Sequence, residues 1–73
     1  MIPHDVISRT VDGVSPVRAW REHLNLTQAE MATRLGISQP AYVEQESGQM
    51  RLRKATKEKI AAALRITLEQ LDF

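Results

Sequence analysis

The residues of this chain best suited to chemistry are cations that could neutralise phosphate. Among 73 residues there are ten Lys and Arg and nine Asp and Glu, giving a formal net charge of +1. The average hides an uneven distribution, because bases outnumber acids only after residue 48. A dense basic cluster follows there: Arg51, Arg53, Lys54, Lys57 and Lys59. Such a run is usually a solvated surface, but it is also typical of a phosphate-binding face.

Catalytic chemistry finds no comparable support. His4 and His23 do not lie beside an acid, Ser or Cys arrangement that would suggest a triad, and we expect His23 on the outward side of its helix. The chain has no cysteine, so it has neither disulfides nor a thiolate metal site. It also lacks a glycine-rich phosphate loop, metal-ligand spacing and a nucleophile elbow. The sequence therefore predicts a protein that is not an enzyme and needs no metal or cofactor.

The clearest structural signal is a helix predicted at about residues 28–35. Thr27 followed three residues later by Glu30 is a capping box that starts it. Gly36 can adopt the left-handed conformation that ends it. We expect the apolar residues of this helix on one face: Ala29, Met31, Ala32 and Leu35.

A second short helix is predicted at about residues 39–46. Ser38 is a new N-cap, and Pro40 suits a first turn, where its missing N–H costs nothing. Two helices joined by so tight a turn cannot lie antiparallel and must cross steeply. This is the geometry of a helix-turn-helix.

Three further helices complete the expected domain. Ser15-Pro16 opens one of them, and its inward residues are expected to be Val17, Trp20 and Leu24. The next spans about residues 54–64, with a buried side made of Ile60, Ala61, Ala63 and Leu64. Thr67 caps a last short helix that ends at Leu71.

These elements predict an all-α protein of one domain. Residues 1–13 are a leader with a possible short amphipathic helix, and residues 14–73 are the five-helix domain. Apolar runs are too short to span a bilayer and the chain does not open with a signal peptide, so we expect a cytoplasmic protein with no membrane partner. A chain of this length has a small core and marginal stability, which dimerisation would supplement.

Several residues of the two central helices form a recognisable pattern: Leu26-Thr27-Gln28, Ala32, Gly36-Ile37-Ser38, Tyr42 and Glu46-Ser47-Gly48. Together they resemble the lambda-repressor-like (Xre/Cro) helix-turn-helix family over about residues 17–71. The resemblance implies a five-helix domain that binds double-stranded DNA. It also implies a homodimer that reads a palindromic operator and represses transcription, in an autoregulatory setting.

The resemblance assigns base reading to the helix at residues 39–46. Its base-reading positions are Gln39, Ala41 and Glu44. Gln39 has the geometry to pair with adenine, Glu44 can accept from cytosine N4, and Ala41 can touch a thymine methyl. The alternative is that these residues are merely solvated, and it is strongest for Glu44 because DNA phosphates repel a carboxylate.

Phosphate binding is assigned to a second set of residues: Gln28, Ser38, Arg51, Arg53, Lys54 and Lys57. Gln28 is the first residue of its helix, where free N–H groups and the helix dipole favour an anion. The resemblance gives Arg21 and Glu46 a structural role, as a buried ion pair that locks two helices together.

The dimer contact has two candidate locations. One is the apolar C-terminal group Leu68, Leu71 and Phe73, and its rival is the leader, through Ile2, Val6, Ile7 and Val11. The chain also departs from the family pattern at three positions, where Gln45, Lys57 and Arg65 replace residues that are commonly apolar, leucine and glycine.

A narrower likeness leaves the biological role open. Residues 2–6 and 12–22 look like the approach to the first helix in antitoxins of bacterial toxin–antitoxin modules. The alternative function is therefore an antitoxin that mainly neutralises a protein toxin, with DNA binding as feedback. A third hypothesis is that the domain is a protein-interaction adaptor. The absence of cations from residues 39–46 supports it. The operator sequence, a toxin partner and the direction of regulation do not follow from the sequence.

Overall fold

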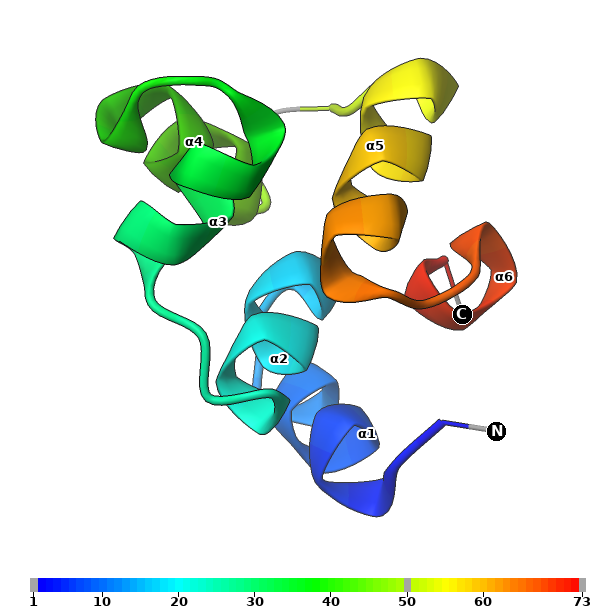
Figure 1. Cartoon of the computed structure of the whole chain (residues 1–73). Helices are drawn as coiled ribbons and strands as arrows, with labels where there is room; N and C mark the ends of the chain where they lie inside the picture. Colours follow the sequence, from blue (N-terminus) through cyan, green and yellow to red (C-terminus); the bar gives the residue numbers. More distant parts are fainter. Residues whose placement is uncertain (1, 50, 73) are drawn as a thin grey trace.

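The computed structural model describes residues 2–49 and 51–72, and these form helices and no strand (Figure 1). The expected all-α class is confirmed. The helices are α1 (His4–Val11), α2 (Pro16–His23), α3 (Gln28–Leu35), α4 (Gln39–Glu46), α5 (Lys54–Leu64) and α6 (Leu68–Leu71). The leader therefore contributes a helix of its own, α1, in addition to the five expected after it.

Local capping signals in the sequence set where most of these helices begin. The Ser15 hydroxyl accepts from the Arg18 N–H at 3.2 Å at the start of α2. Thr27 and Glu30 form the reciprocal capping box that begins α3. The same device, made by Thr67 and Gln70, begins α6. These caps satisfy N–H groups that have no partner within the helix, so short helices can form at fixed positions.

Two helices end in the left-handed conformation at residues other than glycine. Asn25, just after α2, has φ 58°, and Arg65, at the end of α5, has φ 59°. Asn tolerates this conformation because its short polar side chain can bond locally, whereas an ordinary side chain is strained. Arg65, which replaces the glycine common in the family, therefore adopts the left-handed backbone of a glycine turn, and this costs stability.

The core is formed by one or more residues from each helix. Its members are Val6, Val17, Ala19, Trp20, Met31, Ala32, Tyr42, Ile60, Ala61, Leu64 and Leu71. Trp20 also ties α2 to α6, because its indole Nε1 donates to the Gln70 carbonyl oxygen at 3.0 Å. The leader helix belongs to this core, since the Val6 side chain is completely buried.

Two expectations about apolar residues are wrong. Leu24 is 38% exposed rather than inward, because α2 ends at His23 and Leu24 is its C-cap. Ala29 is exposed, because α3 buries its Met31 and Ala32 instead. Leu71 is 3% exposed because it packs within its own chain, so little of its side chain is left for the predicted dimer contact. The dimer candidate Phe73 lies outside the described residues.

A polar cluster fastens α1 to α2. Asp5 Oδ2 lies 2.7 Å from Arg9 Nη1 on its own helix and 2.8 Å from His23 Nδ1 on α2. The hydrogen bond from His23, with a further one from Arg9, lowers the pKa of Asp5 below its usual 3.8. His23 is thus not a simple outward residue: it lies against α1 and meets the Trp20 ring edge-on. None of the helices formed by the described residues is long and apolar enough to cross a membrane.

Candidate nucleic-acid interface

The turn between α3 and α4 is held by backbone bonds that the glycine makes available. Gly36 has φ 68°, in the left-handed region, and its N–H bonds back to the Thr33 carbonyl at 3.2 Å. The next N–H, that of Ile37, bonds to the Ala32 carbonyl at 3.0 Å, and the Ile37 side chain packs against the core. Because backbone hydrogen bonds and the packing of the Ile37 side chain both hold the turn, the direction of α4 relative to α3 is fixed.

One side of α4 is buried and the other is open. Tyr42 is completely buried and Glu46 is 3% exposed, so these two residues define the inner side. The predicted base readers Gln39 and Glu44 are exposed, and so is Val43, at 38%. Ala41, the third predicted reader, is half-buried. The helix therefore offers solvent an amide, an apolar group and a carboxylate.

Beneath this surface, the Glu46 carboxylate joins three helices. Arg21 of α2 donates from Nε to Glu46 Oε1 at 2.7 Å, and its Nη2 lies 2.7 Å from the same oxygen in an ion pair. Gln28 of α3 donates to Glu46 Oε2 at 3.0 Å. The remaining Arg21 nitrogen, Nη1, donates to the Leu26 carbonyl at 2.7 Å. The ion pair that the resemblance implies is thus present, and its side chains are 12% and 3% exposed for Arg21 and Glu46.

The α2 N-terminus contacts the same end of α4. Ser15 Oγ donates to the Glu46 backbone carbonyl, and a Cβ at Gly48 would lie 3.3 Å from Ser15 Cβ. Tyr42 lies near the ion pair, but its hydroxyl has no hydrogen-bond partner among the described residues. Burial raises the pKa of Tyr42 far above its ordinary value, with a further increase from Glu46 that Arg21 opposes. Tyr42 therefore packs in this region as a buried, uncharged side chain.

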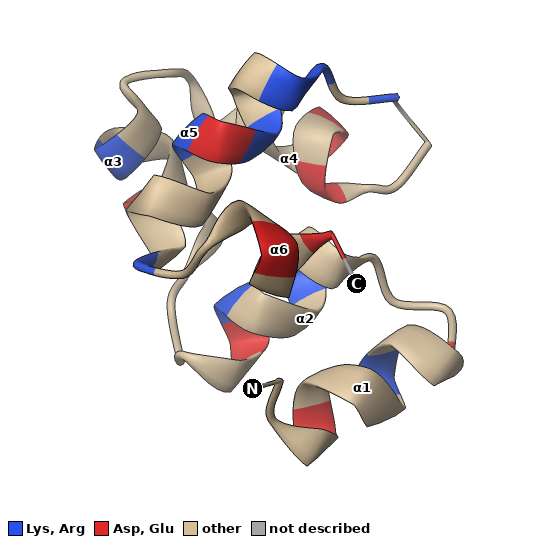
Figure 2. Ribbon diagram, turned by 90° about the vertical axis from the view of Figure 1, so that its right-hand side faces the viewer, with Lys and Arg blue, Asp and Glu red and all other residues tan. Residues whose placement is uncertain are grey.

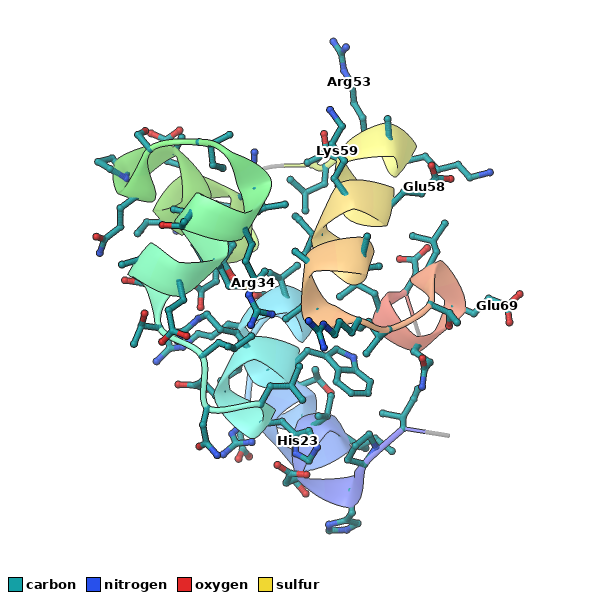
Figure 3. All side chains as sticks on the ribbon, in the orientation of Figure 1. His23, Arg34, Arg53, Glu58, Lys59 and Glu69 are labelled. Atoms are coloured by element: carbon teal, nitrogen blue, oxygen red, sulfur yellow. The ribbon has the colours of Figure 1, made fainter. Side chains whose placement is uncertain are left out.

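Of the predicted phosphate ligands, three cations are freely exposed. Arg51, Arg53 and Lys54 lie in the loop after α4 and at the start of α5, where Figure 2 shows Lys and Arg residues close together. Arg53 extends away from the body of the protein at this end of α5 (Figure 3). Lys57 differs, because its Nζ lies 3.2 Å from Asp72 Oδ1. Its charge is already partly neutralised within the chain.

Gln28 and Ser38 occupy helix starts, as the sequence predicts. Ser38 is exposed, and its hydroxyl accepts from the Ala41 N–H at 3.3 Å as the N-cap of α4. Gln28 is half-buried, and its amide nitrogen is directed to Glu46. The sequence analysis assigned Gln28 to phosphate binding and did not predict this contact with Glu46. No group of His, Asp and Glu suited to holding a metal ion gathers within the described part of the chain.

The comparisons with known proteins address this arrangement. A family model described as helix-turn-helix matches residues 17–71, which is more than half of the chain. The chain belongs to the Xre/lambda-repressor-like helix-turn-helix family. No curated protein and no solved structure matched in the other two searches. By its family, this helix-turn-helix protein is a DNA-binding transcription regulator, a class that is generally not enzymatic.

Proposed function

We propose that this helix-turn-helix protein is an autoregulatory repressor that binds a palindromic operator as a homodimer. The observation that carries the proposal is the combination of an open α4 face with exposed cations directly after it. Gln39, Val43 and Glu44 are open to solvent, and Arg51 and Arg53 follow in the next loop. A reading surface flanked by phosphate-binding cations is what sequence-specific DNA recognition requires.

The chemistry of α4 favours particular base edges. The Gln39 amide can donate to N7 and accept from N6 of an adenine, and Val43 offers an apolar contact for a thymine methyl. Arg51, Arg53 and Lys54 would position the duplex by binding phosphate, without reading sequence. Gln28 would add a contact at the start of α3, since an amide nitrogen that donates one hydrogen to Glu46 retains another.

Two protomers are needed for a palindromic site. Copies of α4 placed about 34 Å apart would enter successive major grooves on one side of the duplex. Among the C-terminal dimer candidates, Leu68 is half-buried and so keeps some surface for a partner. The proposed DNA surface leaves α1 free, because α1 lies at the other end of the protein from α4 and the start of α5 (Figures 1 and 2).

The test is a titration of the protein against fluorescent DNA from its own upstream region and against a scrambled duplex, at two salt concentrations. We expect at least about a thousandfold preference for the upstream DNA, with two protomers per site by analytical ultracentrifugation. Gln39→Ala should weaken binding to the upstream DNA by about 1–3 kcal/mol and leave the scrambled duplex nearly unaffected. Equal binding of both duplexes by the wild-type protein would refute the proposal.

A second candidate function, neutralisation of a protein toxin, is favoured by one observation. Ile7 and Val11 of α1 are 41% and 80% exposed, so α1 presents apolar side chains at the end of the protein away from α4. A protein partner bound there would leave the proposed DNA surface free. The test is co-purification with the product of an adjacent gene, for wild-type protein and for the Ile7→Ser/Val11→Ser variant. Retention of the partner by both proteins would contradict a role for α1.

A further inference from the structure

We propose that Glu44 determines operator specificity by penalising wrong sequences, rather than by adding affinity for every sequence. The proposal rests on the proposed function, because it requires the outer face of α4 to enter the major groove. In this proposal, Glu44 weakens DNA binding in general but allows it where a base edge supplies a hydrogen-bond donor.

The first observation is that Glu44 lies at the centre of the open side of α4. Tyr42 and Glu46 define the buried side. At 100° per residue, the direction opposite to these two residues falls close to Pro40 and Glu44, both of which are exposed. Pro40 has no N–H to donate. Glu44 is therefore the central hydrogen-bonding group that this face offers to a groove.

The second observation is that the Glu44 carboxylate has no cation partner. It takes part in none of the ion pairs formed by residues 2–49 and 51–72. By contrast, the carboxylate of Glu46 two residues later accepts a hydrogen bond from Arg21 and forms an ion pair with it. No Lys or Arg occurs in the last turn of α4, or anywhere between Gln39 and Glu46.

The third observation is that Glu44 is placed where the fold itself disfavours a carboxylate. It lies in the last turn of α4, next to the negative end of the helix dipole. An acidic residue there destabilises the folded chain, and a phosphate backbone close to it adds repulsion. A neutral residue at this position would serve both folding and non-specific DNA binding better. The carboxylate is thus explained by discrimination between sequences.

The chemistry of the base edges then gives the rule. In the major groove, cytosine N4 and adenine N6 present donors, whereas guanine and thymine present acceptors. A carboxylate is an acceptor only. Glu44 is tolerated where it meets cytosine N4 or adenine N6, and it is repelled by the oxygen atoms of guanine and thymine.

The experiment separates the charge of Glu44 from its ability to accept a hydrogen bond. Operator half-sites are selected from a randomised duplex library by the full chain, and the affinities for the selected duplex and a scrambled duplex are then measured. The proteins compared are the wild type, Glu44→Gln, Glu44→Ala and Glu69→Gln. Glu69 is the matched control, because it is exposed on α6 and points away from the rest of the protein (Figure 3).

We expect both Glu44 variants to bind the scrambled duplex about threefold more tightly at 0.1 M salt, with a steeper salt dependence. Glu44→Ala should also bind the selected duplex about tenfold more weakly, whereas Glu44→Gln, which keeps an acceptor, should bind it as well as the wild type does. Glu44→Gln should melt at a higher temperature than the wild type, and Glu69→Gln should change neither affinity.

Three results would overturn the inference. One is unchanged affinity of both Glu44 variants for the scrambled duplex, and another is equal gains from Glu69→Gln and Glu44→Gln. The third is a selected half-site with guanine or thymine oxygen invariably facing Glu44. If the wild-type protein selects no sequence at all, the proposed function fails, and this outcome is distinct from the other three.

Discussion

Breaking the buried ion pair between Arg21 and Glu46 should be among the most damaging single changes to the fold. In Arg21→Met, the Glu46 carboxylate, 3% exposed, would keep only the Gln28 amide as a side-chain donor. Leaving one charge of a buried pair without its partner costs about 3–5 kcal/mol. A domain of this length has a total stability of about 4–11 kcal/mol. The variant should therefore lose a large share of its stability.

The control for this change lies on the same helix. Arg18 pairs with Glu22 at 3.4 Å, but its side chain is 54% exposed, so Arg18→Met should cost no more than about 1 kcal/mol. Replacing both partners, in Arg21→Met/Glu46→Leu, should recover most of the loss, because an apolar pair of similar volume needs no compensating charge.

The measurement is urea unfolding followed by circular dichroism and by the fluorescence of Trp20, which is 3% exposed. For a chain of this size, the loss corresponds to a fall in melting temperature of at least about 12 °C. An Arg21→Met variant that loses less than about 1 kcal/mol would refute the reasoning. So would a double variant that is no more stable than the single one.

The remaining predictions concern individual contacts. Arg65→Gly should raise the stability by about 0.5–1 kcal/mol in thermal melts, because it relieves a left-handed backbone, and Asn25→Gly should gain less. Because the pKa of Asp5 is lowered on folding, its stabilisation is present above its ordinary value of 3.8 and is lost as the pH falls through the folded pKa. Melting temperatures measured across this range should therefore fall less steeply for Asp5→Asn than for the wild type, and parallel curves would contradict this origin. In DNA titrations, Arg53→Ala should reduce the salt dependence by about one counterion, whereas Lys57→Ala, whose charge is already paired, should reduce it less.

The features that could be predicted from the sequence are those decided within a few residues. The bounds of α3, α4 and α5 follow from Thr27, Gly36 and Ser38 and from hydrophobic periodicity, because a cap acts on backbone groups three or four residues away. The left-handed Asn25 is likewise a local choice. The exposure of Glu44 on α4 follows from the period of one helix, because Glu44 lies opposite Tyr42 and Glu46.

Other features were decided only when helices distant in the sequence came together. Whether α1 would pack, and that Val6 would enter the core, depended on a complementary surface on α2. The sequence offers Leu71 as a dimer contact, whereas in the structure it is buried within its own chain. The sequence also offers Lys57 as a free cation, whereas in the structure it pairs with Asp72. Burial and ion pairing depend on which surfaces meet. The helices could therefore be placed along the chain from sequence alone, but which of their apolar and charged groups remain available to a partner was set by tertiary packing.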